Sequence, residues 1–331
     1  MPPIVLGTRG SLLARTQTGH VADQLRAAGC DVVVEIIQTT GDAHRDAPIA
    51  SLGRDGVFVH ELEKALLEGR VDAAVHSCKD LPTTDTDGLM VVAVPLRVTP
   101  FDVLITADGK RLADLPAGAV IGTSSIRRVT QLNRLRPDLV TAPLRGNIDT
   151  RLQRVTSGDY AGIILAAAGL ERVGQADRGV ELLTPPHFWP AIAQGALAVQ
   201  GRTSDKAVRE TLALINDPRS HRAIVAERKC LSSLAGGCLA PIGGYAVEAR
   251  GMLELSACVL ENTMRGVLRI DMTAAIEVDG LSDDEALEMA RRLGVRVAEG
   301  LLEQGADAML ARMRERQLTL PASNPSGHDV S

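Results

Sequence analysis

Aromatic residues are the scarcest class in this 331-residue chain, with three Phe, two Tyr and one Trp. Surfaces that bind single-stranded nucleic acid need stacked aromatic rings, so this scarcity argues against nucleic acid as a partner. The formal net charge of −5 is also too small to attract a polyanion or a membrane by bulk electrostatics. Apolar residues make up 45% of the chain, and its length favours two or three domains with cores of Ala, Val, Leu and Ile.

Long apolar runs and paired cysteines are also missing. The longest fully apolar run, near residues 163–168, is far shorter than the roughly 20 residues of a membrane span. The N-terminus carries no basic leader, so we expect a cytoplasmic protein without a membrane partner. Five cysteines without a CxxC pair fit a reducing compartment and argue against a tetrathiolate zinc site, so we expect no metal.

Strand-like and helix-like segments alternate over roughly the first 215 residues, which is the rhythm of a parallel α/β sheet. The pattern begins again near Ala119, so we expect two α/β domains around a hinged cleft, with crossings near residues 95–101 and 190–195. Three alternating segments and a capping box from Ser282 to Glu285 predict a final α+β domain with an antiparallel sheet. The expected domains are residues 1–96 with 196–216, 97–195 and 217–316, followed by a disordered tail over 317–331.

Three predicted strand-to-helix junctions carry arginines and small hydroxyl residues. Backbone N–H groups at a helix start attract anions, hydroxyls add donors, and arginine adds a bidentate fork. One such junction is more often an ordinary helix cap, but three at the carboxyl ends of parallel strands favour a ligand cleft. The spacing matches no phosphate loop or dinucleotide fingerprint, so a ligand with several carboxylates fits better than a polyphosphate. The junction residues are Arg9 and Ser11; Thr123, Ser124, Ser125, Arg127 and Arg128; and Arg145, Gly146 and Arg151.

Two further segments carry reactive groups. Lys79 and Asp80 follow a predicted strand, either as a surface ion pair or as cleft residues whose carboxylate transfers protons or stabilises a cation. His76 and Cys78 beside them are expected to be packed in the interior rather than to bind metal. Cys238 follows two glycines in a predicted loop, a context that suits a covalently modified thiol as well as a plain loop cysteine.

Taken in chain order, these segments resemble the porphobilinogen deaminase (hydroxymethylbilane synthase) family over about residues 4–260. The resemblance implies two α/β domains like those of periplasmic binding proteins, flanking a cleft, and a smaller α+β domain that carries a cofactor cysteine. It also implies a transferase of porphyrin and heme biosynthesis, which we expect to be a monomer. The matching segments are GTRGS (7–11), GVFVHELE (56–63), AVHSCKDLP (74–82), GTSSIRR (122–128), LRGN (144–147) with TRL (150–152), QG (194–195) and GGC (236–238).

In that family, four porphobilinogen molecules are condensed head to tail with loss of ammonia on a dipyrromethane primer, and hydrolysis releases the linear tetrapyrrole hydroxymethylbilane. The resemblance implies that Cys238 holds the dipyrromethane through a thioether and that Asp80 is the catalytic carboxylate. The acetate and propionate groups of each pyrrole explain the many arginines. Matching cofactor-binding positions are Cys238, Lys79, Asp80, Thr123, Ser124, Ser125, Arg127, Arg128, Arg145 and Gly146. Matching substrate-binding positions are Arg9, Ser11, Gln17, Phe58, Arg145, Arg151, Arg172 and Gln194.

Three positions depart from the family pattern. Asp55 stands where many relatives have a lysine, which changes the electrostatics of its loop. Ala193 stands where a glycine is usual and is expected to stiffen a hinge, and Cys78 replaces a more common methionine in a conservative packing change.

Two other functions would use the same cleft. A non-catalytic solute-binding module for a polycarboxylate would need a signal peptide and gives no reason for Cys238. A ligand-sensing domain of a regulator would need a helix-turn-helix with basic surroundings, which the sequence does not indicate.

Overall fold

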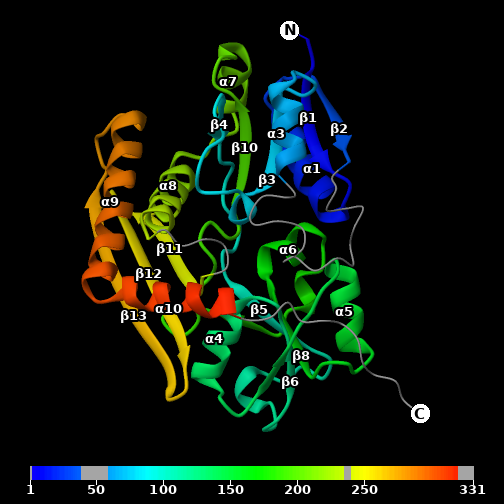
Figure 1. The fold of residues 1–331 in the computed structure, drawn as a ribbon. Coiled ribbons are helices and arrows are strands. Elements are labelled where there is room, and N and C mark those ends of the chain that lie inside the picture. The colour runs from blue at the N-terminus through cyan, green and yellow to red at the C-terminus, as the bar shows by residue number, and fades with distance from the viewer. Residues whose placement is uncertain (1, 39–58, 235–239, 320–331) are drawn as a thin grey trace.

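Three β-sheets organise the part of the chain that the computed structural model describes (Figure 1). Two have five strands, in the orders β2-β1-β3-β10-β4 and β7-β6-β8-β5-β9, and the third has the order β11-β12-β13. The structure describes residues 2–38, 59–234 and 240–319, so Asp55, Phe58 and Cys238 lie outside the described residues. The predicted fold class is confirmed as two α/β units and a smaller unit with an antiparallel sheet.

The first five-stranded sheet combines parallel pairs with one antiparallel strand. β1 pairs in parallel with β2 and β3, whereas β10 runs antiparallel between β3 and β4. Leu6 and Leu25 belong to the core under α1, and Leu62 and Val71 to the core under α3, so apolar side chains cover both faces. The elements are β1 (Ile4–Arg9), α1 (Leu12–Ala27), β2 (Val32–Ile37), α3 (His60–Leu67), β3 (Ala73–Ser77), η2 (Cys78–Asp80), β4 (Leu89–Ala93), β10 (Leu197–Arg202) and α7 (Lys206–Ala213).

The second five-stranded sheet repeats this arrangement. β6 pairs in parallel with β7 and β8, whereas β5 runs antiparallel between β8 and β9. Leu104 and Ile121 belong to one core cluster and Ile105 and Ile163 to another, as expected for alternating sides of buried strands. The elements are β5 (Asp102–Thr106), η3 (Leu112–Asp114), β6 (Val120–Gly122), α4 (Ile126–Leu135), β7 (Val140–Ala142), α5 (Ile148–Thr156), β8 (Gly162–Ala166), α6 (Ala167–Arg172), η4 (Ala176–Arg178) and β9 (Glu181–Leu183).

β10 belongs to the first sheet although it follows the whole second unit in sequence. The chain therefore passes between the two sheets twice, once between β4 and β5 and once between β9 and β10. These two connections contain the crossings expected near residues 95–101 and 190–195. The exact domain boundaries stay a prediction.

The third unit places helices against a three-stranded meander (Figure 1). Ser282 and Glu285 form the predicted capping box at the start of α9. α10 continues through Thr319, so the predicted tail over 317–331 began too early, because the buried Met309 and Leu310 anchor this helix. No helix among the described residues is long and apolar enough to cross a membrane. The elements are α8 (Pro218–Ser233), β11 (Ile242–Ala249), β12 (Met252–Thr263), β13 (Gly266–Glu277), α9 (Asp283–Glu303) and α10 (Ala306–Thr319).

Candidate functional site

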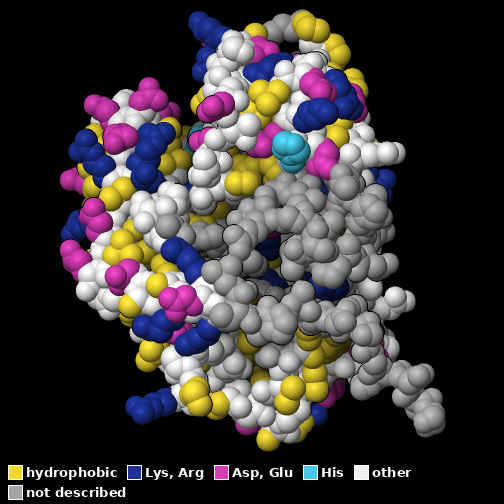
Figure 2. Space-filling view, in the orientation of Figure 1, with side chains coloured by type: hydrophobic (Ala, Val, Ile, Leu, Met, Phe, Trp, Pro, Cys, Tyr) yellow, Lys and Arg dark blue, Asp and Glu magenta, His cyan; other side chains and the backbone are white. Residues whose placement is uncertain are grey.

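A cavity of about 250 Å³ is lined by residues from both five-stranded units and from the second crossing. Figure 2 shows Lys and Arg side chains deep within the central part of the molecule. The cavity lies at the carboxyl ends of β3 and β8, the position where open α/β sheets hold ligands. Among the sequence-predicted site residues that the structure describes, seven line it: Gln17, Lys79, Asp80, Arg128, Arg151, Arg172 and Gln194.

The charge of this lining is strongly unbalanced. Among the described residues of the lining, four side chains are cationic and one, Asp80, is a carboxylate. Burial lowers the pKa of Lys79, although the charge of Asp80 acts in the opposite direction. Burial and the neighbouring charge of Arg128 both lower the pKa of Arg151, and burial lowers that of Arg172 to about 10. Even with Arg128 paired to the buried Asp102, the described cations of the lining outnumber the carboxylates, which favours an anion with several negative charges.

Backbone carbonyl groups orient two of these cations. Arg151 Nε donates to the carbonyl oxygen of Gly146 at 2.7 Å, and Arg172 Nη2 donates to that of Gly195 at 2.7 Å. Gly195 adopts a φ of +88°, and a Cβ there would lie 2.6 Å from the carbonyl oxygen of Val98. A side chain at this position would therefore push the two crossings apart.

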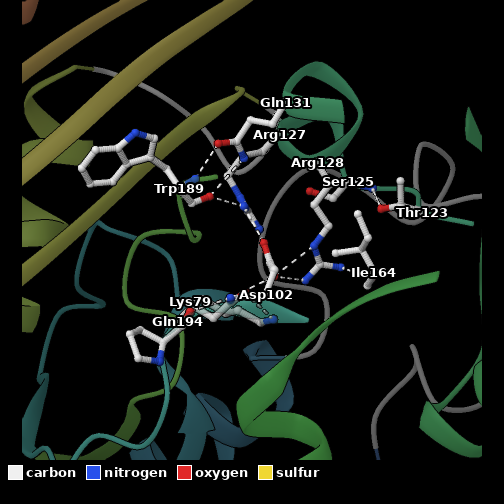
Figure 3. A network of polar contacts seen from close by, with 11 residues as sticks. Lys79, Asp102, Thr123, Ser125, Arg127, Arg128, Gln131, Ile164, Trp189 and Gln194 are labelled. Carbon is white, nitrogen blue, oxygen red and sulfur yellow. Dashed lines mark hydrogen bonds and ion pairs between the residues drawn. The ribbon is translucent and has the colours of Figure 1, made fainter. Parts of the chain in front are cut away.

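Asp102 is the centre of a buried polar network beside the cavity (Figure 3). Arg128 donates to Asp102 Oδ1 from Nη2 at 2.7 Å and from Nε at 3.2 Å. Arg127 donates to Asp102 Oδ2 at 2.7 Å and to the carbonyl oxygen of Trp189. Although burial alone would raise it, the two guanidinium groups hold the pKa of Asp102 well below its usual range. Arg127 is only 5% exposed and does not line the cavity.

The sequence prediction missed Asp102. The signal that could have found it is an acid at the start of an otherwise apolar strand, since a buried carboxylate requires partners. Those partners lie 25 and 26 positions away, at the two arginines that the sequence had assigned to a ligand.

Gln194 connects this network to the first unit. Its Nε2 donates to the carbonyl oxygen of Pro100 at 2.7 Å and to Asp102 Oδ1 at 3.0 Å. Its Oε1 accepts a hydrogen bond from Lys79 Nζ at 3.4 Å. The Gln17 amide is hydrogen-bonded to the hydroxyl of Ser77, with 2.9 Å between Nε2 and Oγ. Both glutamines are almost fully buried, so their orientations are set by the protein.

Several predicted hydroxyl residues are engaged with the chain itself. Ser11 caps α1 by accepting from the amide of Ala14. The Ser124 hydroxyl donates to the carbonyl of Leu144 at 2.9 Å and accepts from the same residue's amide at 3.0 Å, which joins the ends of β6 and β7. The sequence-predicted residues that the structure describes but does not bring into the cavity lining are Arg9, Ser11, Thr123, Ser124, Ser125, Arg127, Arg145 and Gly146.

Apart from Ser77, the rest of the described lining is apolar. Leu13, Ile148 and Leu165 contribute aliphatic surface from α1, α5 and β8. His76 and Cys78 are buried beside the cavity, as expected, and burial lowers the pKa of His76 to about 4 and raises that of Cys78 to about 11. Within the described residues no three His, Cys, Asp or Glu side chains converge as metal ligands would.

Comparison with known proteins identifies two family models along the chain. "Porphobilinogen deaminase, dipyromethane cofactor binding domain" matches residues 4–210, and "Porphobilinogen deaminase, C-terminal domain" matches residues 221–303. The porphobilinogen deaminase of Acidothermus cellulolyticus is 44% identical over 328 residues, which cover 98% of this chain and 95% of that protein. That of Syntrophobacter fumaroxidans is 45% identical over 312 residues, covering 93% of this chain and 96% of that protein.

Solved structures with a similar course of the chain are more distant in sequence. The methionine binding protein MetQ is 12% identical, with a TM-score of 0.41, over 63% of this chain and 88% of that one. The periplasmic VFT2 domain of Bordetella pertussis BvgS is 16% identical, with a TM-score of 0.38, over 65% of this chain and 86% of that one.

Proposed function

The chain belongs to the porphobilinogen deaminase family, and from that premise we propose that its cationic cavity is where porphobilinogen units are bound and joined. The chain is a transferase of porphyrin and heme biosynthesis that uses a dipyrromethane cofactor. It condenses four porphobilinogen molecules head to tail with loss of ammonia and releases hydroxymethylbilane by hydrolysis. The observation that supports the location is that the described lining of the cavity holds four cations and one carboxylate. Family membership decides against the alternative of a non-catalytic binding module.

The side chains that line the cavity fit a dipyrromethane with its acetate and propionate groups. Arg128, Arg151 and Arg172 offer planar forks that match carboxylates, and Lys79 adds a compact positive charge. Leu13 and the other aliphatic residues of the lining offer the apolar surface that a pyrrole ring needs. When bound, the dipyrromethane supplies a tethered primer, which keeps the effective concentration of the growing end high at each addition.

Cys238 is proposed to form the thioether to the cofactor. It lies in the connection between α8 and β11, outside the described residues. Cys230 and Cys258 are poorer candidates, because burial raises the pKa of both to about 12 and leaves little reactive thiolate.

Asp80 is proposed as the catalytic carboxylate. It ends η2 directly after β3, is exposed, and is the single carboxylate among the described residues that line the cavity. Its negative charge acts to raise the pKa of both Lys79 and Arg151, against the larger lowering by burial, and all three residues line the cavity. From this position Asp80 accepts hydrogen bonds from pyrrole N–H groups, offsets the positive charge that develops when ammonia leaves, and receives the proton released from the attacking pyrrole.

The remaining predicted residues are proposed to serve later stages of elongation. They are proposed to contact a longer oligopyrrole or to support residues that do. Phe58 lies outside the described residues, and the others do not contribute to the lining described above: Arg9, Ser11, Thr123, Ser124, Ser125, Arg127, Arg145 and Gly146. We also propose that the enzyme acts as a cytoplasmic monomer without nucleic-acid or membrane partners. The sparse cysteines, the scarce aromatics and the small net charge support this proposal.

Substitution of Asp80 tests the assignment. Asp80→Asn should keep the covalent adduct but lower turnover of porphobilinogen by about 100-fold or more, which is the usual contribution of a general acid–base group. Asp85→Asn is the matched control, because Asp85 is 67% exposed, follows Asp80 by five positions and does not line the cavity. Ammonia release and intact mass are measured for both. An unchanged rate in Asp80→Asn would remove Asp80 from the mechanism.

A further inference from the structure

Asp102 lies behind the cavity wall rather than in it. Its side chain is fully buried at the start of β5, and its two oxygens accept four hydrogen bonds from Arg127, Arg128 and Gln194. Two of these donors, Arg128 and Gln194, line the cavity, whereas Asp102 does not. The carboxylate therefore contacts the wall only through the side chains that it holds (Figure 3).

The orientation of the Arg128 guanidinium follows from these contacts. Nε and Nη2 donate to Asp102, and Nη1 donates to the carbonyl oxygen of Ile164 at 2.9 Å. Three of its five N–H groups are thereby used, which fixes the plane of the fork. One N–H on each terminal nitrogen remains, and such a pair can bind a ligand carboxylate.

Asp102 also determines which atom of Gln194 meets Lys79. A carboxylate can only accept, so Gln194 must direct its amide nitrogen toward Asp102 and the carbonyl of Pro100. The amide oxygen is then the atom left to accept from Lys79 Nζ. Asp102→Asn would allow the Gln194 amide to rotate by 180°, which exchanges its oxygen and nitrogen and directs N–H groups at the Lys79 ammonium.

The charges of Arg127 and Arg128 also indicate that Asp102 acts on the cavity through Arg128. Arg127 and Arg128 are consecutive residues in the first turn of α4, and both are less than 10% exposed. Asp102 neutralises one of these two positive charges and leaves the other for the cavity. Arg127 is further occupied by the carbonyl of Trp189, so the positive charge that reaches the cavity is that of Arg128.

We propose that Asp102 is a positioning residue for the condensation reaction, which aims Arg128 directly and Lys79 through Gln194. The proposal rests on the proposed function of the cavity. It predicts that Asp102 acts as a fixed negative charge and does not exchange protons during turnover.

The test compares Asp102→Asn with Glu261→Gln. Glu261 is equally buried and is also paired with two arginines, Arg312 at 2.6 Å and Arg316 at 2.9 Å, but it lies in the third unit and does not line the cavity. Asp102→Asn should lower kcat/KM for porphobilinogen at least tenfold, by the same factor at every pH between about 6 and 9. Glu261→Gln should lower the melting temperature but keep kcat/KM within about twofold.

Three outcomes would overturn the proposal: a folded Asp102→Asn with kcat/KM within twofold of wild type, a loss no larger than that in Glu261→Gln, or a displaced limb of the pH–rate profile. The displaced limb would show that Asp102 itself exchanges protons. The intact mass of the wild-type protein is measured separately. A wild type without a covalent adduct would contradict the proposed cofactor attachment and not the role of Asp102.

A second variant keeps the proposal testable if Asp102→Asn does not fold. Gln194→Met leaves the ion pairs of Asp102 intact and removes the amide that connects Asp102 to Lys79. It should keep the melting temperature within a few degrees and lower kcat/KM at least fivefold. Wild-type kinetics in this folded variant would overturn the link from Asp102 to Lys79.

Discussion

The carboxylate of Glu227 and the guanidinium of Arg97 form a buried ion pair, with 2.5 Å between Oε1 and Nη1 and exposures of 0% and 7%. Glu227 also accepts from the backbone amides of Ala193 at 2.6 Å and Ala246 at 2.8 Å. Arg97 Nε donates to the carbonyl oxygen of Gln194 at 2.9 Å. Because Arg97 lies on the first crossing and Ala193 on the second, this single pair ties both crossings to α8 and β11 of the third unit.

Removing the charge of Glu227 should therefore destabilise the whole chain. Glu227→Gln leaves the Arg97 guanidinium buried without its counter-charge, which lowers the free energy of unfolding by about 3–5 kcal/mol. Asp23→Asn is the control, because Asp23 and Arg26 form an ion pair whose side chains are 73% and 49% exposed and should contribute under about 1 kcal/mol. Urea denaturation measures both. Equal losses in the two variants would contradict this role of Glu227.

Arg151 should contribute to binding in a way that its neighbour Arg154 does not. Both lie on α5, but Arg151 lines the cavity, whereas Arg154 pairs with Asp159 at 2.9 Å on the exposed surface. Arg151→Gln removes a charge-assisted hydrogen bond of about 1.5–3 kcal/mol, so KM for porphobilinogen should rise about tenfold or more. Arg154→Gln should change KM less than twofold. Steady-state kinetics at low and high salt measure KM for both variants. An equal rise in KM in Arg151→Gln and Arg154→Gln would show that Arg151 does not bind the substrate carboxylates.

His76 makes the stability of the fold depend on pH. Burial lowers its pKa from the ordinary 6.5 to about 4, so between these values the unfolded chain binds the proton more readily than the folded chain. The stability contributed by neutral His76 is complete above about pH 6.5 and is lost as the pH falls toward 4. Between pH 7 and 5 this loss is about 2 kcal/mol.

His76→Gln should therefore lose about 2 kcal/mol less stability than wild type when the pH is lowered from 7 to 5. His187→Gln, which removes an exposed histidine, should follow the wild-type pH dependence. Denaturant titrations at both pH values measure the difference. A His76→Gln variant with the same acid sensitivity as wild type would show that His76 does not titrate in this way.

Gly195 should be intolerant of a side chain because of both its backbone conformation and its surroundings. Gly109 has a similar left-handed φ of +74°, but no atom lies within 4 Å of the position that a Cβ would take there. Gly109→Ala should cost about 1–2 kcal/mol, which is the left-handed penalty alone. Gly195→Ala should cost about 1–3 kcal/mol more, because the Cβ meets the Val98 carbonyl oxygen. Equal free energies of unfolding for the two variants would contradict the close approach of the crossings.

Helix-capping residues in the sequence predicted where several helices begin. Ser11, Asn147 and Ser282 stand before apolar periodic segments, and each caps a helix in the structure. The antiparallel insertion of β10 between β3 and β4 could not be read in this way, because no local pattern identifies a strand's partners 100 residues away. The sequence analysis did not predict α10, because its apolar residues are buried only by packing against the rest of the third unit, which no local pattern shows.

The site was predictable where its residues stand at the carboxyl ends of strands. Asp80 and Arg151 follow predicted strands and line the cavity, which favours the cleft interpretation of Asp80 over a surface ion pair. The sequence could not show that the protein itself also engages the hydroxyl of Ser124 and the guanidinium of Arg127, and their binding of a ligand stays a prediction. Ala193 was expected to stiffen a hinge, and the structure places it at a φ of 60°, a conformation that favours glycine.

The most direct test of the central claim is the intact mass of the purified protein. Wild type should exceed the mass of its polypeptide by two porphobilinogen units less two molecules of ammonia, because each bond formed to a new unit releases one ammonia. Cys238→Ser should show the polypeptide mass alone, whereas Cys30→Ser, which removes a half-buried thiol of the first unit, should keep the increment. A wild-type protein of bare polypeptide mass that still converts porphobilinogen would contradict the account.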